Sequence, residues 1–245
     1  PIMPNKRRRK ATAIATLERP AEKPRLADLL AALSMMSDLG MGYPADEAIH
    51  TCLVATSLAR RMHLDDHTVS AVYYTTLLQH VGCTAYAHEE SLLFGGDEIA
   101  ARTRVASRDL VRPRDVLAFL FLDLAADQAL PRRAPIVARA LIGAPSAMRD
   151  LAASTCEVAA MMARRLGLGE EVQRALKDTR ERWDGKGQPR RLAGDDIALP
   201  ARLAQVAAIA VVFRRMAGDE AALAVVRQRA DTALDPAVAD AFARF

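Results

Sequence analysis

Residues 181–189 read Glu-Arg-Trp-Asp-Gly-Lys-Gly-Gln-Pro and lie between two stretches rich in alanine and leucine. This run holds the single tryptophan of the chain, Trp183, together with two glycines and a proline. Glycine and proline at this density between helical patterns predict a loop whose backbone takes conformations that other residues avoid. A tryptophan in such a loop usually anchors it to the body of the protein. We therefore expect a fixed loop between two helices, with Trp183 as its anchor.

The composition around this loop predicts an all-α fold. The chain has 245 residues, which is enough for a sizeable core. Apolar residues make up 51%, but only 4% of the residues are aromatic. Abundant alanine and leucine with few aromatic residues favour closely packed helices over a sheet. No segment alternates apolar and polar residues for long enough to predict a strand.

The spacing of apolar residues predicts the helices and the order in which they follow one another. Asp65 and Asp66 occupy the place of an N-cap before one helix. The helix at 199–216 is apolar on nearly every side, so we expect it to be central. Residues 85–96 are expected to form a connection. The predicted helices are 25–39, 45–63, 67–80, 97–107, 113–124, 134–142, 147–166, 170–182, 199–216, 221–233 and 236–245.

The first 24 residues form a basic leader that contains the run Lys6–Lys10. We expect a flexible, solvated arm, which leaves open a weak contact with nucleic acid or an acidic partner. The start is basic without a following apolar segment, and no apolar run is long enough to span a bilayer. Three cysteines at wide spacing do not predict a disulfide framework. The expected location is the cytoplasm, without a membrane association.

Two segments of the chain resemble each other. Residues 51–64 and 155–168 both begin Thr-Cys and carry an Ala-Arg-Arg sequence at the same spacing. We expect two helices with similar packing environments on the two sides of one core. Coincidence of composition is the alternative explanation.

The loop and its neighbours also resemble a known family. Residues 181–204, ERWDGKGQPRRLAGDDIALPARLA, are similar to the signature segment of HD-GYP domains. Further likeness lies at His50, at residues 77–83 (LLQHVGC) and at residues 234–242. The resemblance implies one HD-like helical bundle over residues 25–245, with an HD-like half over 25–125 and a GYP-like half over 126–245. Residues 1–24 would be the arm that precedes it.

HD-GYP domains hydrolyse cyclic dinucleotides with two or three metal ions, commonly iron or manganese, so the resemblance directs attention to the ligand positions. Only His50 keeps the residue type that the family carries. Other side chains stand at the remaining positions: Gln79, His80, Cys83, Thr155, Thr179, Arg180 and Val211. One imidazole cannot supply the donors that such metals require. The resemblance therefore implies a scaffold that has lost the inherited chemistry, with no catalytic residue assigned.

Two interpretations remain open. The first is a catalytically inactive sensory or regulatory module that binds a nucleotide, another small molecule or a protein, including a second copy of itself. Similar degenerate domains precede LuxR-type helix-turn-helix domains, so DNA would be bound through a separate domain. The candidate ligand-binding residues are Gln79, Arg180, Arg182 and Trp183.

The second interpretation is a metal-dependent phosphohydrolase or cyclic-dinucleotide phosphodiesterase with a rebuilt metal site. Histidine and cysteine side chains near the old site suit a divalent metal such as zinc, iron or manganese. The first interpretation requires no cofactor. The candidate ligands of the second are His50, His80, Cys83 and His88.

Overall fold

The computed structural model describes residues 25–94, 98–126 and 128–244. The described residues form helices and no strand, apart from one isolated bridge between Ala230 and Leu234. This confirms the predicted all-α class. The predicted N-terminal arm lies outside the described residues. No helix among the described residues has the length and apolar character needed to cross a bilayer.

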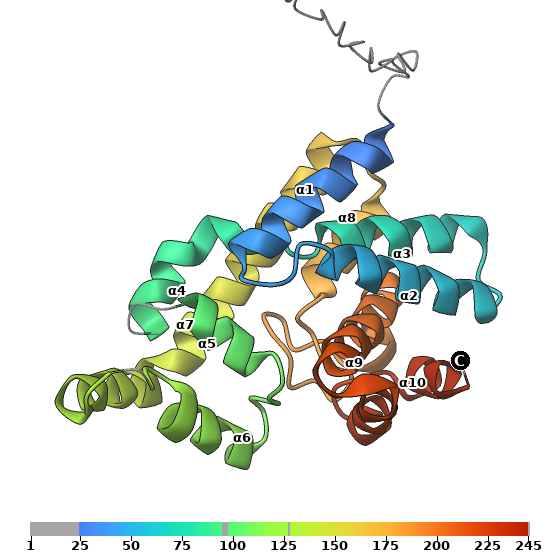
Figure 1. The fold of residues 1–245 in the computed structure, drawn as a ribbon. Helices are drawn as coiled ribbons and strands as arrows, with labels where there is room; N and C mark the ends of the chain where they lie inside the picture. The colour runs from blue at the N-terminus through green and yellow to red at the C-terminus, as the bar shows by residue number, and fades with distance from the viewer. Residues whose placement is uncertain (1–24, 95–97, 127, 245) are drawn as a thin grey trace, which may run out of the picture.

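The helices follow one another in the order shown in Figure 1. Two short 3-10 helices and one π-helical turn, marked η, complete the set. The elements are α1 (Leu26–Gly40), α2 (Glu47–Arg61), α3 (Asp66–Leu78), η1 (Cys83–Tyr86), α4 (Ala87–Phe94), α5 (Glu98–Val105), α6 (Pro113–Ala118), η2 (Phe119–Asp123), α7 (Leu130–Arg165), α8 (Glu170–Asp178), η3 (Gly194–Asp196), α9 (Leu199–Arg229) and α10 (Pro236–Ala243).

Side-chain caps fix where two of these helices begin. The Asp65 carboxylate accepts a hydrogen bond from the Thr68 N–H at 2.8 Å, so the predicted N-cap of α3 is confirmed. Asp235 caps α10 in the same way, through the N–H groups of Ala237 and Val238. Pro236 follows at the first helical position, where its missing N–H has no consequence.

The core forms around α9, as the apolar pattern predicts. Leu203, Val206 and Ala207 on this helix are fully buried. They pack in one cluster with residues of α2, α3 and α10. A second cluster joins α2 and α3 to α7 and α8. Segments from the two predicted halves of the chain therefore share one core.

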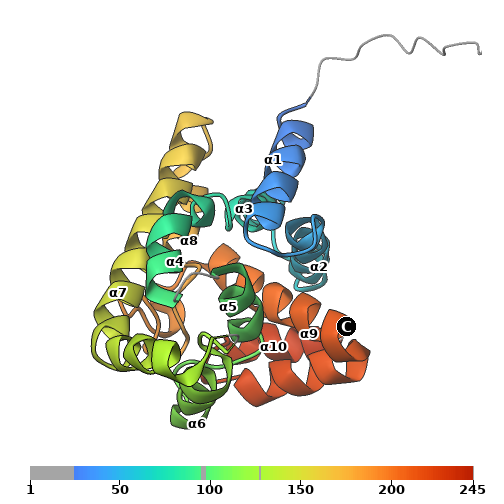
Figure 2. The same cartoon turned by 60° about the vertical axis from the view of Figure 1, so that its left-hand side comes forward.

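A smaller cluster lies to one side of this core. Phe119, Leu120 and Leu124 pack there with Ile136 of α7, and Phe94 and Val105 border them. Figure 2 shows α4 beside α7 on one side of the molecule and α2 and α9 on the other, with α5 between them. The region between α4, α5 and α7 therefore lies next to this smaller cluster and apart from the core around α9.

The two similar segments form corresponding parts of the core. The matched alanines Ala55 and Ala159 are 0% and 1% exposed. Both helices end in a left-handed residue, His63 (φ 57°) in one and Gly167 (φ 74°) in the other. The N–H of the next residue then bonds to the carbonyl of Ala59 or Ala163, at 3.1 and 3.0 Å. The α2–α3 and α7–α8 pairs are thus built by the same turn.

Several helix boundaries differ from the sequence prediction; for example, the helix predicted at 170–182 ends at Asp178. The helices predicted at 134–142 and 147–166 are one helix, α7, which continues through Pro145. A proline removes one backbone hydrogen bond but does not prevent neighbouring turns from continuing. The helices at 199–216 and 221–233 form α9, which is kinked at Gly218 (φ 86°). The predicted connection at 85–96 contains η1 and α4.

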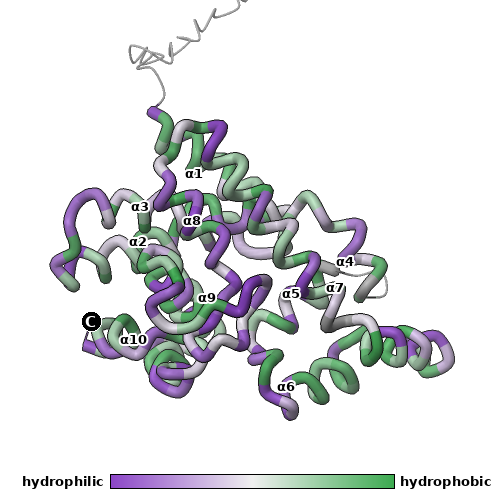
Figure 3. Tube along the Cα trace, turned by 180° about the vertical axis from the view of Figure 1, so that it is seen from behind, coloured by the Kyte–Doolittle hydropathy of each residue, from purple (hydrophilic) through white to green (hydrophobic). Residues whose placement is uncertain are grey.

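Part of the apolar surface remains uncovered by the chain. On α1, Leu29, Met36 and Leu39 are 55%, 71% and 62% exposed. Figure 3 shows the hydrophobic character along this helix. Ser34, Ser37 and Asp38 on the same helix are buried, so polar residues of α1 face the core.

The contact between η1 and α7 leaves no room for a side chain at Gly82. A Cβ atom placed there would lie 1.9 Å from the Thr155 carbonyl oxygen. We expect Gly82→Ala to lower the free energy of unfolding by about 3 kcal/mol, because the clash is with backbone. Urea denaturation measures this change. Gly143→Ala in α7 is the control, since a Cβ atom there meets nothing within 4 Å. An unchanged stability for Gly82→Ala would contradict this close approach.

Candidate functional site

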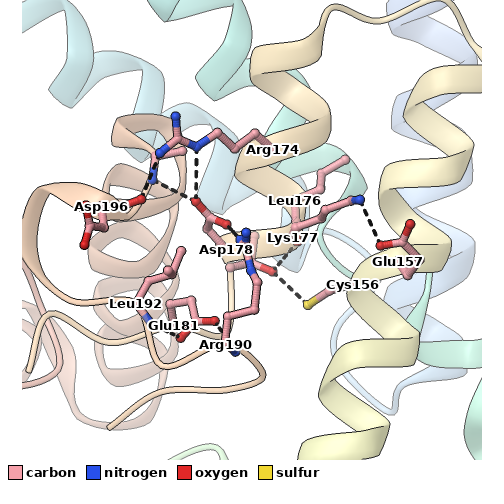
Figure 4. Close-up of polar contacts among 12 residues, drawn as sticks. Cys156, Glu157, Arg174, Leu176, Lys177, Asp178, Glu181, Arg190, Leu192 and Asp196 are labelled. Carbon is pink, nitrogen blue, oxygen red and sulfur yellow. Dashed lines mark hydrogen bonds and ion pairs between the residues drawn. The ribbon is translucent and has the colours of Figure 1, made fainter. Parts of the chain in front are cut away.

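The loop at 181–189 is held by a buried carboxylate at its first residue. Glu181 is 2% exposed. Its two oxygens accept hydrogen bonds from the N–H groups of Arg190 (2.7 Å) and Leu192 (3.0 Å), as Figure 4 shows. The backbone N–H of Trp183 donates to the Ala233 carbonyl at 3.2 Å, and the Arg202 guanidinium lies 5.6 Å from the centroid of the Trp183 ring. The loop is therefore fixed at both ends, and Trp183 contributes to its attachment.

A second buried carboxylate, Asp178 at the end of α8, connects this loop to α9. It is 0% exposed, accepts from the Ala198 N–H at 2.9 Å and pairs with Arg190. On the other side, the Gln205 amide donates to the carbonyls of Asp178 (3.2 Å) and Glu181 (2.9 Å). These bonds satisfy carbonyl groups that the end of α8 leaves without helical partners.

Burial sets the ionisation of both carboxylates. Desolvation raises the pKa of Asp178, and its bond from Ala198 and attraction to Arg190 act in the opposite direction. Desolvation likewise raises the pKa of Glu181, against the bonds from Arg190 and Leu192. Their main contacts are to backbone N–H groups and arginine, so they position the loop and do not face a cavity.

Arg180 lies between these two anchors and points away from them. One of its terminal nitrogens, Nη2, donates to the Cys83 sulfur at 3.2 Å. Attraction to Cys83 raises the pKa of Arg180 above its already high usual value, so the guanidinium is charged. Arg180 is exposed, and its side chain lines a cavity.

That cavity has a volume of about 200 Å³. Its walls come from Met41 at the end of α1, from the helices α4, α5 and α7, and from Arg180 after α8. Most of its walls are apolar. The lining residues are Met41, Tyr43, Glu90, Phe94, Arg102, Val105, Ala106, Leu110, Met148, Leu151, Ala152, Thr155 and Arg180.

The residues predicted from sequence to bind a ligand are not gathered in this cavity. Only Arg180 lines it. Arg182 is engaged elsewhere, by the carboxylates of Asp109 (2.9 Å) and Asp184 (3.1 Å). Gln79 leaves its Nε2 buried without a hydrogen-bond partner among the described residues. Trp183 attaches the loop through its contacts with Ala233 and Arg202.

The residues proposed as metal ligands lie in different surroundings. His50 is exposed and faces Asp46 at 3.6 Å, and His88 is exposed on α4. Cys83 is buried against Arg180. The His80 Nδ1 lies 2.9 Å from Asp38, which is fully buried. The described residues include no group of three or more His, Cys, Asp or Glu side chains placed to hold a metal ion. The four predicted ligands therefore do not form one site.

Three residues of the site were not named from the sequence: Glu90 and Arg102, which line the cavity, and Asp38, which contacts His80. Asp38 had a usable signal, because it lies eight residues after the buried Leu30 and four after the buried Ser34, on the same helical face. Glu90 and Arg102 form a buried ion pair between two helices. Twelve positions separate them in the chain, so no local pattern predicts the pair.

Comparison with known families identifies the part of the chain that contains the loop. Residues 144–238 match the model of the HD domain family. This chain contains an HD domain. The matched segment of the HD domain includes most of α7, all of α8 and α9, and the loop anchored by Asp178 and Glu181.

A curated relative and a solved structure extend the likeness over most of the chain. The 3′3′-cGAMP-specific phosphodiesterase 3 of Vibrio cholerae is 24% identical over 211 residues, which are 86% of this chain and 46% of that protein. A crystal structure of a cyclic GMP-AMP specific phosphodiesterase of V. cholerae matches with a TM-score of 0.64 and 22% identity. It covers 89% of this chain and 48% of the solved chain. The chain spans about half the length of the relatives it matches. The structural likeness supports the HD-like fold.

The residues of this HD domain do not fit the metal centre that the HD-GYP resemblance implies. Where that resemblance places metal ligands, the structure has a charged guanidinium, Arg180, in contact with Cys83. Thr155 donates to the Ala152 carbonyl of its own helix. The Asp38–His80 pair supplies two donors, whereas the family's metals require several more. The described residues therefore supply too few donors for that metal centre.

The anchoring role of Glu181 can be tested by truncation. We expect Glu181→Ala to lower the free energy of unfolding by about 2–4 kcal/mol, because two backbone N–H groups lose their acceptor. Glu157→Ala is the control, since Glu157 is 66% exposed and pairs only with Lys177. Its expected cost is below about 1 kcal/mol. Equal effects in urea denaturation would rule out a special role for Glu181.

Ionisation of Glu181 gives a separate, pH-dependent expectation. Because burial raises its folded-state pKa, the folded protein binds this proton more readily than the unfolded chain. The resulting stability is present below the unfolded pKa of about 4.3 and is lost as pH rises through the folded value. Glu181→Gln removes the titration. The stability of the natural protein relative to this variant should therefore fall as the pH rises above about 4.3, measured by urea denaturation; an increase would contradict the raised pKa.

Proposed function

We propose that this HD domain is a non-hydrolytic regulatory module that binds a small ligand in the cleft at Arg180. The observation that carries this proposal is the Arg180 guanidinium, which donates to Cys83 and opens onto the cavity. At about 4 Å and an effective dielectric constant of about 20, a unit positive charge repels a divalent cation by about 8 kcal/mol. The same charge attracts an anion, and its N–H groups offer directional hydrogen bonds to oxygen.

The proposed ligand is a nucleotide or another small molecule, and the proposed context is signalling or transcription regulation in a bacterial cytoplasm. The support for a nucleotide is the likeness to a phosphodiesterase specific for 3′3′-cGAMP. The support for regulation is the resemblance to degenerate domains that precede LuxR-type helix-turn-helix domains. DNA would then be bound by such a separate domain, with the basic arm as a weaker alternative.

A protein partner or a second copy of the chain belongs to the same proposal. The support is the exposed apolar surface of α1, where Leu29, Met36 and Leu39 lie. Exposed apolar residues that share a helix are typical of contact surfaces.

A second function is favoured by one observation, the relatedness to the cGAMP phosphodiesterase. In this alternative the chain hydrolyses a cyclic dinucleotide with a rebuilt metal site. His80, already paired with Asp38, is the best placed of the proposed ligands, and His50, Cys83 and His88 would have to move toward it.

Metal analysis and a hydrolysis assay distinguish the two functions. We expect the purified protein to carry no stoichiometric iron, manganese or zinc. We also expect 3′3′-cGAMP to remain intact in the presence of Mn²⁺ or Fe²⁺, because the fixed positive charge of Arg180 repels a divalent cation. Stoichiometric metal together with turnover that is lost in both His50→Ala and His80→Ala would establish the phosphodiesterase instead. Arg149→Ala, a change at an exposed residue, controls for nonspecific loss of turnover.

A further inference from the structure

The cavity beside Arg180 is lined by apolar residues in one part and by charged residues in another. Phe94, Val105, Leu110, Met148 and Leu151 supply apolar surface. The charged lining residues are Glu90, Arg102 and Arg180. A cavity with this division suits a ligand that has an apolar body and a charged head.

Arg102 has hydrogen-bonding capacity that the described residues do not use. Its side chain is 6% exposed, and its Nε donates to the Glu90 carboxylate. The two terminal nitrogens, Nη1 and Nη2, are buried and have no hydrogen-bond partner among the described residues. Buried donors are nearly always paired in native proteins, with protein, water or ligand. The two terminal nitrogens of Arg102 are therefore donors with capacity for a further partner.

The geometry of a guanidinium limits what this partner can be. Nη1 and Nη2 form a planar fork that matches the two oxygens of a carboxylate or phosphate. Arg102 lines the cavity, and its two terminal nitrogens lie just beneath the cavity surface, so an oxyanion pairs with both once the guanidinium turns toward the open volume. A neutral amide offers one oxygen acceptor and would leave part of the fork unpaired.

The charge and the volume of the cavity further limit which ligands it can bind. Two arginines and one glutamate line the cavity, which leaves one net positive charge. Burial raises the pKa of Tyr43, so this residue adds no negative charge at neutral pH. The volume of about 200 Å³ lies below that of ordinary pockets for drug-sized ligands, about 300–1,000 Å³. A ligand smaller than a dinucleotide, with a single negative charge, fits these limits.

We propose that this cavity binds a small amphipathic anion, with its oxyanion head on the Arg102 terminal nitrogens and its apolar body between α5 and α7. The inference rests on the proposed function, since it assumes a binding cleft rather than a hydrolytic one. Glu90 acts as a positioning residue, because it holds Nε and thereby orients the fork. The single net charge favours a carboxylate over a phosphate monoester, which carries about −1.5 to −2 at neutral pH.

Three probes of similar shape test this assignment: benzoate, phenyl phosphate and neutral benzamide. Calorimetric titration of the full chain should show binding of benzoate, weaker binding of phenyl phosphate and no measurable binding of benzamide. Tighter binding of phenyl phosphate than benzoate would keep the oxyanion site and overturn the preference for a carboxylate. Absence of binding by either anion up to about 5 mM, a weak affinity by any standard, would overturn the proposal and leave water as the partner of Arg102.

Variants locate the site. Arg102→Met should weaken benzoate binding roughly tenfold or more, the usual effect of losing a charged hydrogen bond. Arg149→Met, an exposed change on α7, should leave it unchanged. Since Arg102→Met leaves Glu90 buried without its partner, Leu151→Trp provides a second test that keeps the ion pair and fills the apolar part of the cavity. Circular dichroism establishes that each variant is folded.

The outcomes separate this inference from the proposed function. Benzoate binding that survives in folded Arg102→Met and Leu151→Trp would place the anion elsewhere and overturn the inference, whatever the hydrolysis assay shows. Turnover of 3′3′-cGAMP with stoichiometric metal would overturn the non-hydrolytic function, even if benzoate binding depends on Arg102.

Discussion

The arrangement of the site depends on two buried carboxylates, Asp178 and Glu181, that bind backbone N–H groups. Removing a carboxylate from water costs several kcal/mol, and hydrogen bonds from N–H groups offset this cost only where the geometry is favourable. Glu181 receives two such bonds from residues nine and eleven positions later, and Asp178 receives one from Ala198. The loop between them has little freedom as a result. Arg180 stands between the two anchors, and the Gln188 N–H donates to its carbonyl at 3.0 Å. Its side chain therefore leaves a fixed backbone and extends toward Cys83.

The features of this fold that arise from neighbouring residues could be predicted from the sequence. Apolar spacing predicts most of the helices, and the capping aspartate at Asp65 marks where α3 begins. Density of glycine and proline predicts the loop at 181–189. The continuity of α7 could not be predicted, because Pro145 is a local signal for a break, yet the helix continues through it. The Asp38–His80 and Glu90–Arg102 pairs join residues that are 42 and 12 positions apart, and only the fold brings them together. The binding residues named from sequence were chosen by their position around the loop. Of these, Arg180 lines the cavity, whereas Arg182 is taken up by neighbouring carboxylates.

The loop and the metal chemistry of the HD-GYP resemblance are physically separable. The contacts that hold the loop are made by Asp178 and Glu181 to backbone groups and by Gln205 to carbonyls. None of these contacts needs a metal ion. Gln79, Thr155 and Arg180 stand where the resemblance places metal ligands, and the contacts that hold the loop do not involve their side chains. The fold shared with the V. cholerae phosphodiesterase structure is therefore compatible with these side chains.

A guanidinium in this place changes the chemistry of the cleft without reversing its charge. A divalent metal attracts an anion, polarises its bonds and supplies activated water. Arg180 retains the first of these properties, because its charge is fixed and its N–H groups can bind oxygen. It has no vacant orbital with which to activate water or a phosphoryl group. Arg102, on the element α5, adds a second cation, which is buried and whose charge Glu90 balances. Under the proposed function, the charge of the lining residues, two arginines and one glutamate, favours holding an anion, and none of these three side chains supplies the activation that a metal ion would provide.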